Sequence, residues 1–191
     1  MRTATVTRTT RETDITVTLS LDGGEVNVQT GIGFFDHMLE AFAVHSGIGL
    51  SVCAKGDLHV DGHHTVEDTA IVLGQAFAKA LGDKGGIERY GHFYIPMDES
   101  LCFASLDISG RPYLVFDARF PEEKVGDYDS CLTSEFFRAL AFHAGWTLHL
   151  RVLYGQNTHH MIEGLFKAAA HAVKAAVTPC DGVLSTKGSL D

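Results

Sequence analysis

One arrangement of motifs occurs twice in this 191-residue chain, and that repeat restricts the folds open to it. The motif His63-His64-x-x-Glu67 recurs 96 positions later as His159-His160-x-x-Glu163. Upstream of each copy lies an apolar pattern with helical spacing, which ends in the sequence His-x-Gly. The same kind of motif at equivalent places in two segments indicates an internal duplication. We place the boundary between residues 84 and 100, which gives half-repeats of 1–92 and 93–191 that together form one compact unit.

Hydrophobic periodicity predicts the elements of the first half. Strict alternation over residues 15–21, the turn Asp22-Gly23-Gly24 and a second apolar run at 26–28 predict a hairpin with one buried face. From Phe34 the spacing becomes helical, which predicts a helix that ends near Gly47. A strand over 50–54 and a helix over 64–81 follow.

The second half predicts the same order of elements. Residues 101–108 and 111–118 form the expected hairpin, 132–144 and 159–177 the helices, and 147–153 the strand between them. Each half is then a small β-sheet covered by two α-helices, so the fold class is α+β. This order of elements argues against a doubly wound nucleotide-binding fold.

Composition excludes several classes of function. The net charge of −9 weakens any reading as a nucleic-acid binder, and an anionic ligand would need a local group of Lys or Arg. No apolar run approaches the length of about 18 residues that spans a membrane, and the N-terminus has no apolar leader segment. We therefore expect a cytoplasmic protein whose four cysteines stay reduced.

The paired motifs predict a metal centre. Adjacent side chains on a helix diverge by about 100°, so His63 and His64 cannot easily bind one ion together. Glu67 lies four residues beyond His63 and three beyond His64, so it shares a helix face with either one. Each motif can therefore serve two neighbouring ions, and the second copy adds His159, His160 and Glu163.

Two further ligands follow from the repeat. His37 in the first half corresponds to Glu135 in the second half, and both offer a nitrogen or oxygen donor. Mixed nitrogen and oxygen ligands suit Mn²⁺, Fe²⁺ or Co²⁺ and disfavour a closed structural zinc site. His45, at the end of its helix, is a weaker candidate for the pocket. The residues alone leave open an enzyme or a metal-binding shell.

Several stretches resemble imidazoleglycerol-phosphate dehydratase, an enzyme family of histidine biosynthesis. The resemblance covers nearly the whole chain, and its motifs occur in order and at matching spacing. They are the segments 11–13, 30–39, 61–68, 97–99, 109–113, 157–163, 166–167 and 185–188. The chain departs from the pattern at Glu135, where many members of the family carry a histidine.

The resemblance implies a reaction and an assembly. Imidazole-glycerol phosphate loses water to give imidazole-acetol phosphate, through an imidazolate ring held between two Mn²⁺ ions. The family forms homo-oligomers of twenty-four subunits built from trimers, with active sites where subunits meet. The resemblance involves no nucleic acid and no membrane. A dinuclear metallohydrolase and a non-enzymatic metal-binding shell remain the alternatives.

The resemblance also assigns roles to residues of this chain. Glu12 is the expected general acid or base, and His64, Glu67, His160 and Glu163 complete the catalytic set. The expected metal ligands are His37, His63, His64, Glu67, Glu135, His159, His160 and Glu163. The expected substrate-binding residues are Glu12, His37, His45, Arg89, Arg111, Lys167, Ser185 and Lys187. Of these, Arg89, Arg111, Ser185 and Lys187 are expected to bind chiefly the phosphate.

Overall fold

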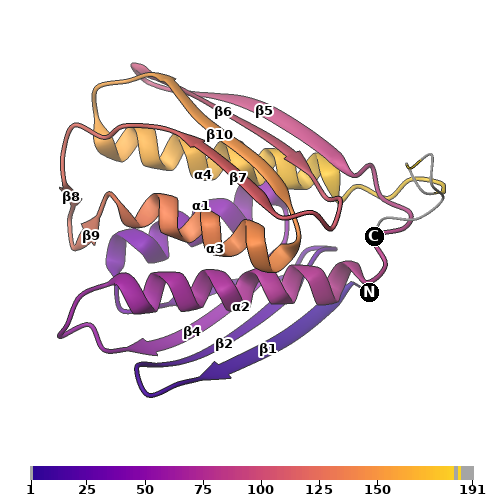
Figure 1. Cartoon of the computed structure of the whole chain (residues 1–191), viewed down its shortest axis with the longest axis horizontal. Coiled ribbons are helices and arrows are strands. Elements are labelled where there is room, and N and C mark those ends of the chain that lie inside the picture. Colours follow the sequence, from indigo (N-terminus) through magenta and orange to yellow (C-terminus); the bar gives the residue numbers. More distant parts are fainter. Residues whose placement is uncertain (1, 183–184, 186–191) are drawn as a thin grey trace.

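The first half of the chain forms a four-stranded sheet and two helices. The computed structural model describes residues 2–182 and 185 (Figure 1). The sheet has the strand order β1-β2-β4-β3. Its elements are β1 (Thr3–Thr9), β2 (Thr13–Ser20), β3 (Val26–Gln29), α1 (Gly33–Ser46), β4 (Gly49–Gly56) and α2 (His63–Leu81).

The second half repeats this plan. Its sheet has the order β5-β6-β10-β7, which is the order of the first sheet with each strand replaced by its counterpart. The elements are β5 (Tyr90–Met97), β6 (Ser100–Asp107), β7 (Tyr113–Asp117), α3 (Leu132–Ala144), β10 (Thr147–Tyr154) and α4 (Thr158–Ala176). A small hairpin precedes α3, formed by β8 (Lys124–Val125) and β9 (Tyr128–Asp129). The predicted α+β fold with two similar halves is confirmed.

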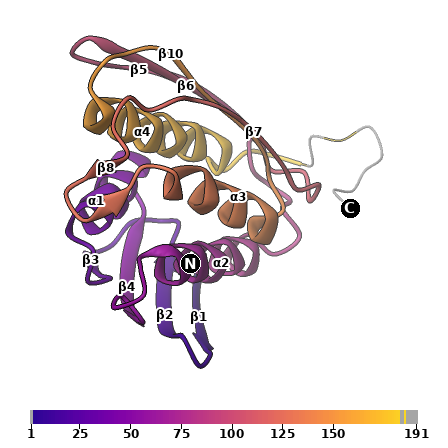
Figure 2. The ribbon, with the colours of Figure 1, turned by 60° about the vertical axis from the view of Figure 1, so that its left-hand side comes forward.

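The four helices lie between the two sheets, as Figures 1 and 2 show. α1 packs against α4, and α2 packs against α3, so each helix pair contains one helix from each half. The apolar positions that the helical spacing singled out, such as Phe42, Phe77 and Phe166, are fully buried in this layer. No helix in the described part of the chain is long and apolar enough to cross a membrane.

The two predicted hairpins are wrong, because in each case another strand lies between the two strands expected to pair. β4 lies between β2 and β3, antiparallel to β2 and parallel to β3, and β10 lies between β6 and β7 in the same way. Alternation reports which face of a strand is buried but not which strand lies beside it. After β2 the chain crosses over the start of β4, where Gly24 and Gly49 approach so closely that a Cβ on Gly49 would lie 2.8 Å from the Cα of Gly24.

The first strand of each sheet carries no clear sequence signal. β1 is rich in threonine and pairs with β2 at the edge of its sheet, and β5 holds exposed aromatic side chains and Pro96. Alternation in β1 is limited to Ala4 and Val6 between threonines, and β5 does not alternate, so our sequence analysis predicts neither strand. Residues 82–89 connect the end of α2 at Leu81 to the start of β5 at Tyr90, in the second sheet.

The close approach of Gly24 and Gly49 gives a testable prediction. Substitution Gly49→Ala places a methyl group 2.8–2.9 Å from backbone atoms of residues 23 and 24, so one segment must shift. We expect a loss of about 1–3 kcal/mol of unfolding free energy and a melting temperature lower by roughly 2–10 °C. Differential scanning calorimetry would measure it. Gly33→Ala is the control, because nothing lies within 4 Å of its added methyl group, and an equal loss in both variants would contradict the argument.

Candidate metal centre and active site

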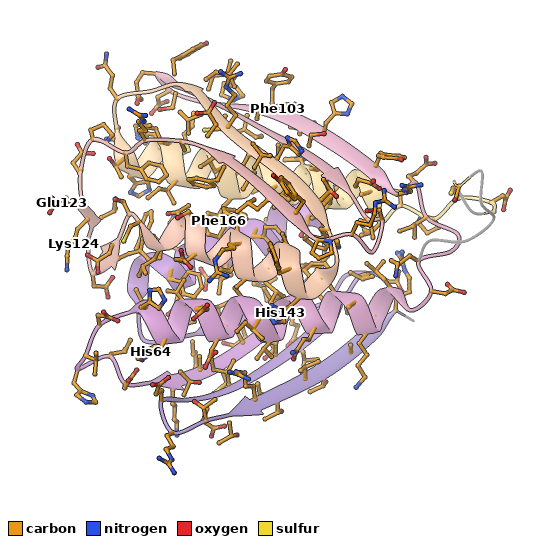
Figure 3. The ribbon with its side chains drawn as sticks, viewed as in Figure 1. His64, Phe103, Glu123, Lys124, His143 and Phe166 are labelled. Atoms are coloured by element: carbon orange, nitrogen blue, oxygen red, sulfur yellow. The ribbon has the colours of Figure 1, made fainter. Side chains whose placement is uncertain are left out.

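All eight predicted metal ligands lie in the first two turns of their helices, at one end of the molecule. His63, His64 and Glu67 begin α2, and the second motif begins α4 in the same way. Glu135 belongs to the first turn of α3, and His37 begins the second turn of α1. Figure 3 shows His64 at this end of α2, on the same side of the molecule as Glu123 and Lys124 of the β8 region.

Three of these residues form a first cluster between α1 and α4. The ligand atoms of His37, His159 and Glu163 all lie within 4.8 Å of one another. Nε2 of His159 is 3.0 Å from Oε2 of Glu163, and Nε2 of His37 is 3.7 Å from the same oxygen. Lys167 places its Nζ 2.7 Å from Oε1 of Glu163. Burial of this carboxyl acts to raise its pKa, but the positive charge of Lys167 and the nearby His37 outweigh burial and hold the pKa below the usual value.

A second cluster lies between α2 and α3. His63, Glu67 and Glu135 bring their ligand atoms within 4.8 Å of one another, and Nε2 of His63 is 3.7 Å from Oε2 of Glu67. The guanidinium of Arg138 lies between the two carboxylates. Its Nη2 donates to Oε1 of Glu67 at 2.8 Å and to Oε2 of Glu135 at 2.7 Å.

Each cluster therefore combines both halves of the chain. The motif on α4 receives His37 from the first half, and the motif on α2 receives Glu135 from the second half. This crossing follows from the pairing of α1 with α4 and of α2 with α3. The sequence predicts the ligands but not this assignment, because periodicity within a helix does not say which helix lies beside it.

The second histidine of each motif belongs to neither cluster. The ring centroids of His63 and His64 are 6.1 Å apart and those of His159 and His160 are also 6.1 Å apart, with nearly perpendicular planes. Nδ1 of His64 lies 3.0 Å from Oδ2 of Asp57, and Nδ1 of His160 lies 2.8 Å from Oε2 of Glu99.

Neither of these two carboxylates is among the predicted site residues. Glu99 falls within a motif that marks the resemblance, whereas Asp57 follows a strand without any pattern around it. Each histidine donates a hydrogen bond to its carboxylate, and this bond raises the pKa of the histidine.

Glu12 lies beside His64, in the turn between β1 and β2. Its Oε2 is 3.8 Å from Nδ1 of His64, and 54% of its side chain is exposed. The predicted general acid or base therefore stands at the metal-ligand end of the molecule.

The two clusters fit a divalent cation. Each offers three imidazole or carboxylate donors and no sulfur, which is the donor chemistry of Mn²⁺ and its neighbours. Glu163 is 6% exposed, and Lys167 supplies the positive partner that a buried carboxylate needs. Three donors do not fill an octahedral coordination shell, so each cluster leaves positions for ligands from elsewhere.

Two of the predicted phosphate-binding residues, Arg89 and Arg111, lie at the opposite end. The backbone N–H of Arg89 donates to the carbonyl of Ala176, at the last residue of α4, whereas His159 lies in its first turn. Seventeen residues of helix span about 25 Å. Arg89 also donates through Nε to Asp107 at 2.7 Å, and Arg111 is 3.5 Å from the same carboxylate. Ser185 is half-buried, and Lys187 lies outside the described residues.

His45 lies neither in a cluster nor beside the arginines. Its Nδ1 is 3.2 Å from Nε2 of His171 on α4, and the ring of Phe93 stacks on His171. Burial lowers the pKa of both imidazoles, and the charges of Lys167 and Lys174 lower them further.

This histidine pair gives a prediction about acid stability. Because the folded-state pKa of both imidazoles is lowered, the unfolded chain binds more protons, and their contribution to stability is lost as the pH falls below the ordinary histidine pKa of about 6.5. The variant His171→Gln removes one of these groups. We expect its melting temperature to fall less between pH 8 and pH 5.5 than that of the unsubstituted protein. An equal or larger fall would contradict the prediction.

Comparison with known proteins identifies the family of this chain. Residues 30–173 match the family model described as imidazoleglycerol-phosphate dehydratase. The chain is 60% identical to the imidazoleglycerol-phosphate dehydratase of Symbiobacterium thermophilum, with 99% of this chain and 93% of that protein covered. It is 57% identical to the enzyme of the same name from Lacticaseibacillus casei, with 98% and 99% covered.

Solved structures are similar as well. The crystal structure of imidazoleglycerol-phosphate dehydratase from Staphylococcus aureus has a TM-score of 0.85 and 43% identity, and it covers 93% of this chain and 99% of that one. The structure from Pyrococcus furiosus, in complex with (S)-C348, has a TM-score of 0.86 and 36% identity, with 97% and 100% covered. The chain therefore belongs to the imidazoleglycerol-phosphate dehydratase family and is a hydro-lyase of histidine biosynthesis.

Proposed function

We propose that this chain dehydrates imidazole-glycerol phosphate to imidazole-acetol phosphate with the help of two Mn²⁺ ions. The observation that carries the proposal is the presence of two three-donor clusters at one end of the molecule, with the carboxylate of Glu12 beside the second motif histidine. When bound, the two cations would supply positive charge at the ring nitrogens and favour the imidazolate form of the ring. An electron-rich ring can expel the hydroxyl group on the adjacent carbon.

Glu12 supplies the proton transfer in this scheme. After the hydroxyl leaves, a base removes the proton from the neighbouring carbon, and the resulting enol becomes the ketone. An exposed carboxylate 3.8 Å from His64 can reach a substrate bound at this end. General acid–base catalysis by a positioned group contributes roughly 10²–10⁴-fold to the rate. His64, His160, Glu67 and Glu163 would hold the two cations against the reacting ring.

The phosphate binds to cations at the other end of a chain. Arg89 and Arg111 share Asp107, and a pair of guanidinium groups suits the planar, bidentate recognition of phosphate oxygens. Ser185 and Lys187 extend this group in our proposal. Lys167 belongs to the metal end through its contact with Glu163.

The active site lies between subunits in this proposal. A substrate a few bonds long cannot bridge about 25 Å of helix α4, which separates the two ends of one chain. One copy must then supply the metal end while another supplies the arginines. A homo-oligomer with closed symmetry meets this requirement, and we propose twenty-four subunits built from trimers. We further propose that the enzyme works in the cytoplasm, where its free cysteines remain reduced.

Product analysis tests the reaction. Metal-free protein loaded with Mn²⁺ and incubated with imidazole-glycerol phosphate should yield the ketone without releasing inorganic phosphate. A dinuclear metallohydrolase would instead use a bound hydroxide as nucleophile and release phosphate. A metal-storing shell would bind Mn²⁺ and leave the substrate unchanged. Absence of the ketone at saturating Mn²⁺ would end the proposal.

Mixed oligomers test the shared site. Glu12→Gln and Arg111→Ala should each lose most activity, because one removes the proton-transfer group and the other a phosphate contact. If each site combines two chains, co-assembled variants should regain about a quarter of the unsubstituted activity, since some sites receive both intact ends. The measurement is turnover of the two proteins dissociated and reassembled together. Mixing without reassembly is the control, and no recovery after reassembly would contradict a site between subunits.

A further inference from the structure

We propose that Asp57 and Glu99 are positioning residues that orient the second histidine of each motif as a metal ligand. We also infer that Asp57 releases Glu12, the repeat counterpart of Glu99, for proton transfer. The first part concerns metal binding alone, and the second part rests on the proposed function. The argument uses contacts that differ between the two halves of a duplicated chain.

Glu12 and Glu99 occupy equivalent places. Glu12 directly precedes the first residue of β2, and Glu99 directly precedes the first residue of β6. Both turns lie beside the second histidine of a motif. The carboxylate of Glu99 is 2.8 Å from Nδ1 of His160, and that of Glu12 is 3.8 Å from Nδ1 of His64.

Both carboxylate oxygens of Glu99 have hydrogen-bond partners. Its Oε1 accepts the backbone N–H groups of Gln156 and Asn157 at 3.0 and 2.8 Å and the hydroxyl of Ser100 at 2.8 Å. Its Oε2 contacts Nδ1 of His160. A carboxylate held by four groups is fixed in place and is poorly suited to move toward a substrate proton.

Glu12 is held only by its backbone. Its carbonyl accepts the N–H of Asp57 at 3.1 Å, while its carboxylate, among the described residues, accepts no hydrogen bond and has His64 as its ion-pair partner. Asp57 takes the place beside His64 that Glu99 takes beside His160. Its two oxygens lie 3.2 and 3.0 Å from Nδ1 of His64. Each second histidine therefore has one carboxylate at Nδ1, but the two carboxylates come from different loops.

Loop length explains this exchange. The loop from β4 to α2 covers residues 57–62, whereas the loop from β10 to α4 covers only 155–157. β10 also contains a register shift between Val152 and Tyr154 where it pairs with β6. The short loop directs two backbone N–H groups at Glu99, whereas the longer loop provides Asp57.

A carboxylate at Nδ1 determines which nitrogen can bind a metal. A neutral imidazole has one N–H, and a carboxylate at Nδ1 holds it there, so Nε2 keeps its lone pair. Asp98 is the other carboxylate near His160, and its Oδ2 is 3.7 Å from Nε2, beyond hydrogen-bond distance. His64 and His160 are then prepared to bind through Nε2 to an ion outside their own cluster.

Mn²⁺ titration followed by electron paramagnetic resonance tests the assignment, because free Mn²⁺ gives a signal that binding weakens. The experiment uses the full, metal-free protein. We expect Glu99→Gln and Asp57→Asn to weaken Mn²⁺ affinity by about 10–100-fold, as loss of a carboxylate partner does in other metal sites. Glu12→Gln should keep the affinity and lower turnover by about 10²-fold or more. Glu25→Gln, an exposed carboxylate between β2 and β3, controls for the loss of one negative charge.

The outcomes separate this inference from the proposed reaction. Unchanged Mn²⁺ affinity in Glu99→Gln and Asp57→Asn would overturn the positioning role, whatever the activity. Equal weakening by Glu12→Gln would overturn the division of roles. If the unsubstituted protein makes no ketone, the proposed function and the role of Glu12 fail, while the titration still decides the role of the other two.

Circular dichroism on heating controls for folding. If Glu99→Gln does not melt cooperatively, Mn²⁺ affinity is measured instead in Glu99→Asp. This variant keeps the charge but shortens the reach of the carboxylate to Nδ1 of His160. Mn²⁺ affinity equal to that of the unsubstituted protein would then overturn the proposal, and a weakened affinity would support it.

Discussion

The packing of each helix against a helix of the opposite half is the constraint on which the rest of the structure depends. Because α1 lies on α4 and α2 on α3, the first turns of all four helices meet at one end of the molecule. Neither half alone could build a three-donor cluster, since each motif lacks its third ligand without the other half. Duplication thus supplied two similar units, and their face-to-face burial of Phe42, Phe77 and Phe166 created the site.

Local patterns predict the helices, the candidate ligands and the α+β class, because hydrophobic periodicity and the repeated motifs can both be recognised within a short stretch of sequence. The strand order is not local. The apolar runs around Val17 and Val28 are neighbours in sequence, yet β4 lies between their strands. The crossing that makes room for β4 is evident from the close approach of Gly24 and Gly49 in the folded chain. Asp57 could not be predicted either, since its role arises from a loop that meets His64 only in the folded chain.

The two ends of the chain have different chemistry. One end holds imidazoles and carboxylates, and the other holds Arg89 and Arg111 around Asp107. Helix α4 keeps them apart, so the proposed function requires a second subunit to bring one end close to the other. The repeat is compatible with the proposed shared site, because two similar clusters on one chain could meet two different neighbours.

Arg138 and Lys167 give the clusters a further property. Each carries a positive charge to the carboxylates that would hold a cation, Arg138 between Glu67 and Glu135 and Lys167 beside Glu163. These carboxylates therefore already have positive partners within the chain. In the proposed function, a cation that binds either cluster would compete with an ammonium or guanidinium group, and selectivity at equilibrium would reflect the difference between the two partners.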